Sequence, residues 1–177
     1  MIYLYVLLGI IAVLVVIGLI LPTKYAVART TTIDAAPAAV HAYVGHLDKW
    51  PDWMPWEQED PSIVTSLSEK TTGVGASQSW SSAKAGDGEV EFTECDESTG
   101  IAYDMAFLNK GRRAPAKASI RYAPSGDATK VTWTMEGDMV SMMPRILAGW
   151  FKLMMDRMIG KQFARGLASL KGKVEAA

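Results

Sequence analysis

The fold prediction starts from SMMPRILAGWFKLMMDRMIGKQFARGLASLK, residues 141–171, near the end of the chain. Ser141 is a suitable helix N-cap, and Pro144 falls in the first turn, where its missing N–H costs no hydrogen bond. Apolar residues then recur at helical spacing: Leu147, Trp150, Phe151, Met154, Met155, Met158, Phe163, Leu167 and Leu170. The pattern predicts a long helix with a wide apolar stripe, and other parts of the chain must cover that stripe.

The chain before this helix supplies a cover, because several segments between residues 62 and 135 alternate in polarity with period two. The clearest segment places Ile101, Tyr103, Met105 and Phe107 on one face. Short turn sequences separate the segments, which predicts consecutive antiparallel hairpins with one apolar face. Residues 27–33 predict a further strand, and a short helix follows it. We therefore predict an α+β fold in which a curved antiparallel sheet of about seven strands wraps the C-terminal helix.

The first segment, residues 2–21, carries no charged side chain. At 1.5 Å per residue, a helix of this length spans roughly 30 Å, the thickness of a bilayer's hydrocarbon core. A cleaved signal peptide is the alternative, since Ala26, Val27 and Ala28 have the A-x-A form, but no basic residue precedes the run and the run exceeds the usual apolar region. We expect a transmembrane anchor at 1–22, a linker at 23–26 and one domain at 27–177.

Two features predict where that domain lies. Lys24 and Arg29 follow the apolar run while no Lys or Arg precedes it, so the positive-inside rule predicts a single-pass protein of the cell membrane with a cytoplasmic domain. The short connection between the run and the first strand reaches at most ~18 Å when extended. The domain is therefore expected close to the lipid headgroups.

Charge is unevenly distributed over a chain whose formal net charge is −1. Residues 29–140 are acidic in balance, whereas residues 141–177 are basic. The basic side chains of the last helix are either its solvated side or a surface for anionic lipid. Cys95, the single cysteine, excludes an internal disulfide and fits a reducing compartment. No nucleic-acid partner is expected, and the sequence specifies no oligomeric state.

The order of predicted elements resembles that of a known superfamily. The matching residues are Thr32 to Ala35 before Pro37; Asp48 with Trp50, Pro51, Asp52, Trp53, Met54, Pro55 and Trp56; Gly73, Val74 and Gly75 before Trp80; and Thr129 to Trp133 before the long helix. On these residues the chain resembles the SRPBCC superfamily, which includes START and birch-pollen-allergen proteins, and within it the polyketide cyclase/dehydrase branch. The resemblance covers residues 27–172 and implies the helix-grip fold. It does not imply one function, because members bind, carry, cyclise or sense different molecules.

Catalytic and metal motifs are sparse. The sequence has no Gly-x-Ser-x-Gly, no glycine-rich phosphate loop and no dinucleotide fingerprint. His41 and His46 are the only histidines, and both are expected on the surface of the first domain helix, where a spacing of five does not place them on one face. Cys95 lies beside Glu94 and Asp96, which disfavour a reactive thiolate. We therefore predict no catalytic residue, no metal site and no cofactor.

The remaining signal is a set of aromatic, sulfur-containing and amphipathic residues on the predicted apolar faces. As the lining of a ligand cavity, the sequence nominates Trp53, Trp56, Gln78, Trp80, Phe92, Tyr103, Met105, Phe107, Tyr122, Trp133, Met135, Trp150 and Met154. The alternative is an ordinary core, which such residues also fill well. Gln78, Tyr103 and Tyr122 carry polar ends and are the candidates for orienting a ligand.

Three functions fit these observations. The first is a membrane-tethered domain that binds a lipid or another apolar small molecule without catalysis. The second is a cyclase or dehydratase acting on a hydrophobic substrate in the same cavity, as the family resemblance implies. The third is a tethered interaction module with a filled core.

Overall fold

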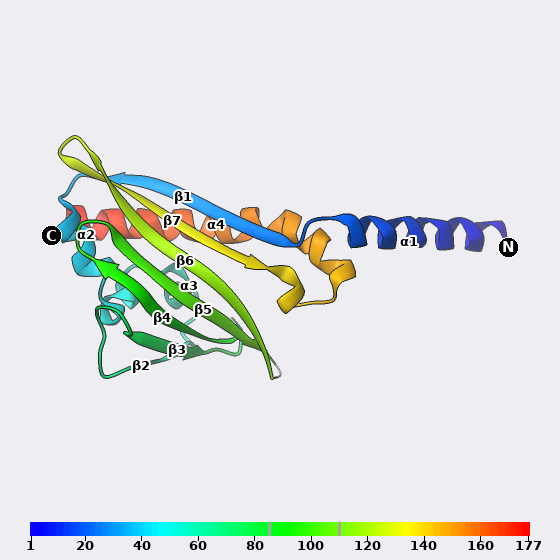
Figure 1. Ribbon diagram of the computed structural model, residues 1–177, viewed down its shortest axis with the longest axis horizontal. Coiled ribbons are helices and arrows are strands. Elements are labelled where there is room, and N and C mark those ends of the chain that lie inside the picture. Colours follow the sequence, from blue (N-terminus) through cyan, green and yellow to red (C-terminus); the bar gives the residue numbers. More distant parts are fainter. Residues whose placement is uncertain (85, 110) are drawn as a thin grey trace.

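The computed structural model describes residues 1–84, 86–109 and 111–177. Its elements are α1 (Ile2–Ile20), β1 (Lys24–Ile33), α2 (Pro37–Val44), the 3-10 helix η1 (Leu47–Asp52), α3 (Pro55–Glu59), β2 (Val64–Leu67), β3 (Ser77–Ser81), β4 (Asp87–Asp96), β5 (Gly100–Asn109), β6 (Arg112–Ser125), β7 (Ala128–Asp138), the 3-10 helix η2 (Met139–Ser141) and α4 (Arg145–Glu175). Helix α1 protrudes from one end of the body that the other elements form (Figure 1).

The strands form one antiparallel sheet in the order β1-β7-β6-β5-β4-β3-β2. The sheet curves around α4, which runs along β1 and β7 (Figure 1). A register shift between Phe92 and Glu94 interrupts the pairing of β4 with β5, and such a bulge increases the local bend. The predicted α+β helix-grip fold is confirmed, with seven strands and a long C-terminal helix over the described residues.

Alternation along β6 shows how the sheet acquires a dry concave face. Ala114, Ala116, Ala118, Ile120 and Tyr122 are buried, and the residues between them are exposed or half-buried. The alanines pair with larger residues of the neighbouring strand, so that Ala116 lies opposite Met105 and Ala118 opposite Tyr103. Small side chains beside large ones leave room for the aromatic rings on this face.

Two element boundaries differ from the sequence prediction. Helix α4 begins at Arg145 with Pro144 as its N-cap, four residues later than expected, because a proline disfavours helical backbone in the residue before it. The amides of Met142 and Met143 instead bond to the carbonyl of Met139 and continue from η2. Strand β1 begins at Lys24 and not at residue 27, because Lys24 already pairs with Asp138 of β7.

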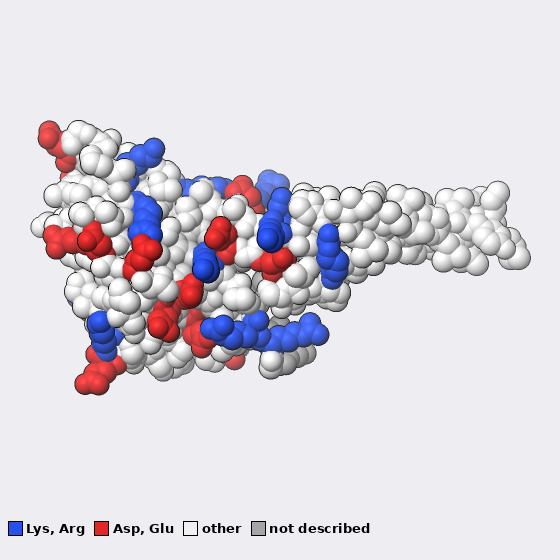
Figure 2. Space-filling model, in the orientation of Figure 1, with Lys and Arg blue, Asp and Glu red and all other residues white. Residues whose placement is uncertain are grey.

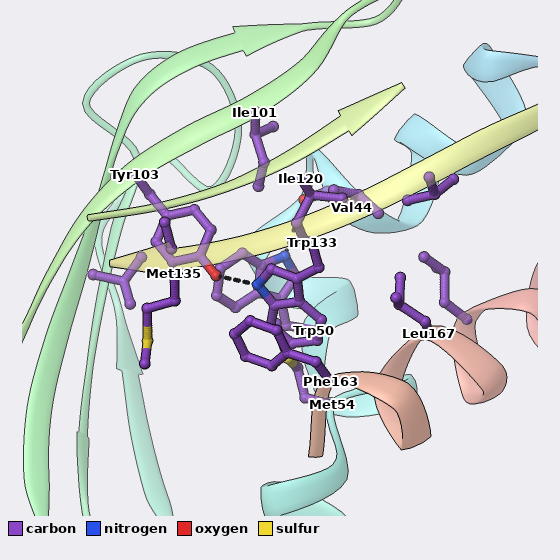
Figure 3. Packing of buried hydrophobic residues seen from close by; sticks show 14 of the residues in the cluster. Val44, Trp50, Met54, Ile101, Tyr103, Ile120, Trp133, Met135, Phe163 and Leu167 are labelled. Atoms are coloured by element: carbon purple, nitrogen blue, oxygen red, sulfur yellow. Dashed lines mark hydrogen bonds between the residues drawn. The ribbon is translucent and has the colours of Figure 1, made fainter. Parts of the chain in front are cut away.

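An aromatic cluster holds α4 against the sheet (Figure 3). Trp133 of β7 and Phe163 of α4 stack face to face, with ring centroids 4.0 Å apart and an interplanar angle of 5°. Trp53 and Trp56 meet the same indole at centroid distances of 5.5 and 5.6 Å. Trp133 is fully buried, and its indole N–H donates to the Tyr103 hydroxyl at 2.9 Å. This ring therefore joins the sheet, α4 and the segment around α3.

Close packing at Gly166 gives a direct test of this arrangement. A Cβ at this position would lie 2.9 Å from Cζ3 of Trp133 and 3.2 Å from Cδ of Pro55, and neither neighbour can move easily. We expect Gly166→Ala to lower the free energy of unfolding by about 1–3 kcal/mol, the usual cost of overpacking. Urea unfolding followed by circular dichroism measures this change.

Gly172→Ala is the matched control for this substitution. Gly172 lies on the same helix, and a Cβ there would meet no atom within 4 Å. The alanine should therefore stabilise the protein by up to about 1 kcal/mol through helix propensity. Equal effects at positions 166 and 172 would contradict the observed packing of α4 on Trp133.

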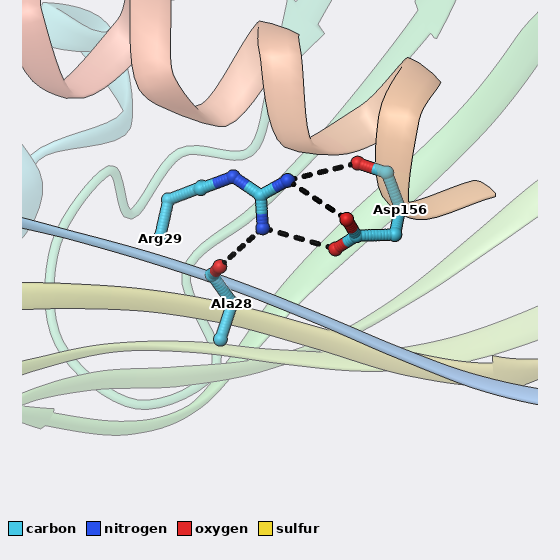
Figure 4. Close-up of polar contacts among 3 residues, drawn as sticks. All are labelled: Ala28, Arg29 and Asp156. Carbon is cyan, nitrogen blue, oxygen red and sulfur yellow. Dashed lines mark hydrogen bonds and ion pairs between the residues drawn. The ribbon is translucent and has the colours of Figure 1, made fainter. Parts of the chain in front are cut away.

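Helix α4 is also tied to the edge strand β1 by an ion pair (Figure 4). The guanidinium of Arg29 donates to both carboxylate oxygens of Asp156, at 2.9 and 3.1 Å, and to the Asp156 carbonyl at 3.0 Å. A further hydrogen bond of 2.7 Å to the carbonyl of Ala28 orients the guanidinium. The bidentate geometry fixes the position of α4 along β1.

The first turns of α4 pack against the end of α1. Gly18 is the buried residue of α1, and a Cβ there would lie 2.3 Å from the carbonyl oxygen of Ile146. The Trp150 indole donates to the Leu14 carbonyl at 3.4 Å, and Arg145 donates to the Gly18 carbonyl at 3.2 Å. Helix α1 is therefore connected to the domain by side-chain contacts as well as by the chain itself.

Candidate functional site

A cavity of about 660 Å³ lies between the concave face of the sheet, α3 and the middle of α4. Its lining is mainly aromatic and aliphatic, with a few polar groups and a charged rim. The lining residues are Trp50, Trp56, Glu57, Ile63, Gln78, Trp80, Lys84, Val90, Tyr103, Met105, Phe107, Trp133, Met135, Met158, Ile159, Lys161, Gln162, Phe163 and Arg165. The curvature of the sheet creates this space, because α4 packs along β1 and β7 and leaves the concave side of β3 to β5 less filled.

Eight residues nominated from the sequence lie in this lining. They are Trp56, Gln78, Trp80, Tyr103, Met105, Phe107, Trp133 and Met135. All except Trp56 come from strands β3, β5 and β7, where alternation directs their side chains to the concave face. Trp56 lies on the short helix α3.

Five nominated residues lie elsewhere. Trp53 and Phe92 are fully buried in the solid core, and Met154 is 55% exposed on α4. Trp150 packs against α1, since its indole bonds to Leu14. Tyr122 lies near the opposite end of the sheet, where its hydroxyl is 3.3 Å from Nδ1 of His41. None of the five is part of the cavity lining.

The same contact changes the interpretation of His41. The sequence predicted a solvated surface residue, whereas the ring is half-buried and lies edge-on to Tyr122. Nε2 of His41 lies 3.6 Å from the sulfur of Cys95. Burial lowers the pKa of His41. The alternation of polarity could not find this contact, because it joins α2 to strands β4 and β6.

Several lining residues were not nominated from the sequence. Met158, Ile159, Lys161, Gln162, Phe163 and Arg165 form the α4 side of the cavity. Met158 and Phe163 belong to the apolar helical stripe recognised in the sequence. The spacing assigned them to that stripe but did not indicate that they line a cavity. Trp50, which was recognised only within the tryptophan-rich segment, contacts Tyr103 with ring centroids 5.5 Å apart.

Two polar groups lie deep in the cavity. Gln78 is 7% exposed, and its Oε1 atom has no hydrogen-bond partner among the described residues. The hydroxyl of Tyr103 accepts a hydrogen bond from the Trp133 indole N–H. The hydroxyl stays protonated because burial raises the pKa of Tyr103. An unpaired buried acceptor is costly, so a hydrogen-bond donor at Gln78 would be favourable. Among the described residues, Gln78 thus offers an acceptor and Tyr103 a donor within an apolar wall.

Charged residues surround the outer part of the cavity. Lys84, Lys161 and Arg165 are exposed, and Arg165 forms an ion pair with Glu59. Burial raises the pKa of Glu57, which also lines the cavity. Gln162 donates to Glu59 at 3.0 Å, while its buried Oε1 has no partner within the described part of the chain. The rim is therefore predominantly basic and the interior apolar.

Solved structures share this architecture. A protein from Chromobacterium violaceum has a TM-score of 0.62 at 16% identity, with 85% of this chain and 96% of that chain covered. Ara h 8.0201 has a TM-score of 0.60 at 12% identity, covering 87% and 99%. The di-domain ARO/CYC StfQ of the steffimycin biosynthetic pathway has a TM-score of 0.66 at 10% identity, covering 86% of this chain and 52% of StfQ. At these identities the likeness establishes the fold alone.

Sequence comparison identifies the family more directly. No curated protein matches this sequence. The family model described as polyketide cyclase / dehydrase and lipid transport matches residues 24–175, which is nearly all of the chain outside α1. This match agrees with the seven-stranded sheet, the long C-terminal helix and the cavity between them. The chain therefore belongs to the polyketide cyclase / dehydrase and lipid transport family.

Proposed function

We propose that this protein binds a lipid or another apolar small molecule in the cavity, without catalysis, while α1 tethers it to a membrane. The observation that carries the proposal is the cavity itself, with its aromatic wall and the unpaired Gln78 acceptor. A volume of about 660 Å³ falls within the range of about 300–1,000 Å³ that is typical of small-molecule sites. Family membership is consistent with hydrophobic ligands.

The polar groups narrow the chemistry of the ligand. Gln78 requires a donor, and Tyr103 can donate to an oxygen. A ligand with an apolar body and a hydroxyl or carbonyl group satisfies both residues. The basic rim adds a preference for an anionic end, such as a carboxylate or phosphate, near Lys84 and Lys161.

The tether is supported by the length and composition of α1. This helix, Ile2–Ile20, is long and apolar enough to cross a membrane, although an N-terminal signal sequence meets the same criterion. It forms a rod without charged side chains at one end of the molecule (Figure 2). The contacts of Gly18 and Leu14 with α4 favour a retained helix, because a cleaved segment would leave Trp150 uncovered. Lys24 and Arg29 favour a cytoplasmic domain.

Glu57 is the specific observation that favours a second candidate, a cyclase or dehydratase acting in the same cavity. Its carboxyl group lines the cavity and has a raised pKa, as a general acid requires. Tyr103 could orient a substrate carbonyl. Non-catalytic binding is favoured because the buried polar residues among the described lining are Tyr103 and Gln78, which do not form an acid and base pair.

Gln78→Leu tests the proposed binding site. Native mass spectrometry of the full chain, released from membranes in mild detergent, should detect an apolar ligand on the wild-type protein. Loss of the hydrogen bond should weaken retention of that ligand about tenfold, which corresponds to roughly 1.4 kcal/mol. A wild-type protein that carries no ligand, and takes up none from a total lipid extract, would contradict the proposal.

Gln58→Leu is the matched control for this experiment. Gln58 lies on α3, is exposed, and donates to the Asp52 carbonyl at 3.3 Å, outside the cavity lining. The control should retain the ligand as the wild type does.

Glu57→Gln tests the second candidate. A chemically altered form of the ligand that is recovered from the wild type but not from Glu57→Gln would favour the enzyme.

A further inference from the structure

The first four turns of α4 carry an apolar stripe that faces away from the core. Leu147, Phe151, Met154 and Met158 follow the spacing i, i+4, i+7, i+11, which places them along one side of the helix. Their exposed fractions are between 45% and 55%. The opposite side of the same turns contains the buried residues Ala148 and Gly149. The stripe is therefore not part of the core that holds α4 in place.

The same side of α4 carries no large apolar residue in the second half of the helix. Continuing the spacing leads to Lys161, Arg165, Ala168 and Gly172, all of which are exposed. A soluble helix would carry polar residues on this side along its whole length. The change occurs after Met158, and the start of the apolar half contacts α1 through Arg145, Ile146 and Trp150. The surroundings of α4 must therefore differ between its two halves.

The depth of α1 explains this difference. Trp150 bonds to the carbonyl of Leu14, six residues before the end of α1. At 1.5 Å per residue, Leu14 lies about 9 Å inside the end of the helix. If α1 spans the hydrocarbon core, the α4 residues beside Leu14 must lie below the level of the headgroups. An exposed apolar stripe is the surface that such a position requires.

A groove between the two helices points to the same environment. It has a volume of about 350 Å³ and is lined by Ile11, Leu14, Val15, Ile146, Leu147 and Trp150. All six residues present apolar side chains, and the groove continues the lipid-facing surface of α1 on to α4. Lipid acyl chains match this lining, whereas water would be poorly accommodated in it.

We propose that the first three turns of α4 are embedded in the membrane leaflet beside α1, with Leu147, Phe151 and Met154 in contact with lipid acyl chains. The proposal rests on the tether proposed above and adds a second membrane-inserted element. The amides of Leu147 and Ala148 bond to the Pro144 carbonyl, and Val140 bonds to Asp138. Lys152 and Arg157 are long enough to reach the headgroups.

This position connects the membrane to the cavity. Met158, the last residue of the stripe, is also a lining residue of the 660 Å³ cavity. Ile159 and Phe163 follow it into the interior. An apolar ligand could therefore pass from the leaflet along α4 into the cavity without crossing bulk water. The basic residues Lys161 and Arg165 begin where the stripe ends and would lie at headgroup level.

Spin-label accessibility of the full chain tests the embedding. Single cysteines replace Phe151 and Met154 in the stripe, Ala168 on the same side of α4, and Leu8 in α1, all in a Cys95→Ala background. Each labelled variant is placed in vesicles of phosphatidylcholine with phosphatidylglycerol. Collisions with oxygen report lipid, and collisions with a polar nickel complex report water. We expect the oxygen-to-nickel ratio at 151 and 154 to match that at 8 and to exceed that at 168 about tenfold.

The outcomes separate this proposal from the tether. Nickel accessibility at 151 and 154 equal to that at 168, with residue 8 in lipid, would overturn the embedding and leave the tether intact. Protection of 151 and 154 from both reagents would indicate coverage by protein, such as a second copy, and would also overturn it. Nickel accessibility at residue 8 would show that the tether itself is wrong. Circular dichroism of each variant establishes that it is folded.

Discussion

Trp133→Ala is expected to lower the free energy of unfolding by about 3–5 kcal/mol, the range for truncating a fully buried large aromatic residue. The indole is 0% exposed and stacks on Phe163, and both Trp53 and Trp56 pack against it. Its removal would also leave the Tyr103 hydroxyl without the hydrogen bond that the Trp133 indole N–H donates to it. Since this side chain joins three parts of the domain, the resulting cavity cannot close by a small local shift.

The measurement is urea unfolding of the full chain in detergent, followed by far-ultraviolet circular dichroism at a wavelength that reports the helices. Met154→Ala is the control, because Met154 is 55% exposed and should change the free energy by less than about 0.5 kcal/mol. A cost below about 1 kcal/mol for Trp133→Ala would mean that α4 does not depend on this cluster.

Gly18→Leu is expected to separate the start of α4 from α1. A Cβ at residue 18 would lie 2.3 Å from the Ile146 carbonyl oxygen and 2.8 Å from Nε1 of Trp150. The backbone contact cannot be relieved by a side-chain rotation, so the helices must move apart. At a typical overpacking cost of about 1–3 kcal/mol, the open population should rise between about fivefold and 150-fold.

Trypsin cleavage after Arg145 in detergent micelles measures this opening, because the Arg145 guanidinium is held by the Gly18 carbonyl in the closed arrangement. Gly9→Leu is the matched control. Gly9 lies on the same helix, and a Cβ there meets no atom within 4 Å. Cleavage should rise in the Gly18 variant and stay at the wild-type rate in the Gly9 variant. Equal rates would show that α1 and α4 do not pack as observed.

Local sequence patterns predicted most of the architecture. The alternation of Ile101, Tyr103, Met105 and Phe107 predicted a strand with one dry face, and the helical stripe predicted α4. These predictions succeeded because a backbone period of 2 or 3.6 residues is a property of the chain itself. The same periods identify which residues share a face, but they contain no information about which neighbour covers that face.

The candidate site shows that limit most clearly. Trp53 and Trp56 are three residues apart and chemically identical, yet one lies in the solid core and the other lines the cavity. Trp150 and Met154 belong to the helical stripe on which the fold prediction was based. Trp150 packs against α1 and Met154 is exposed, because the buried side of α4 at these turns consists of Ala148 and Gly149. The empty volume of a cavity depends on how the surrounding helices and strands are placed relative to one another, and residue type does not specify it.

By itself, the sequence determined the element types, the family and the apolar character of residues 2–21, because each depends on residues close together in the chain. Only the tertiary structure decided which aromatic residues surround empty space, that Oε1 of Gln78 has no partner in the described part of the chain, and that α4 reaches along α1 as far as Leu14. Each of these features joins residues from distant segments. The distances between these segments depend on the curvature of the sheet and the position of the helix, which are set by the packing of the whole domain.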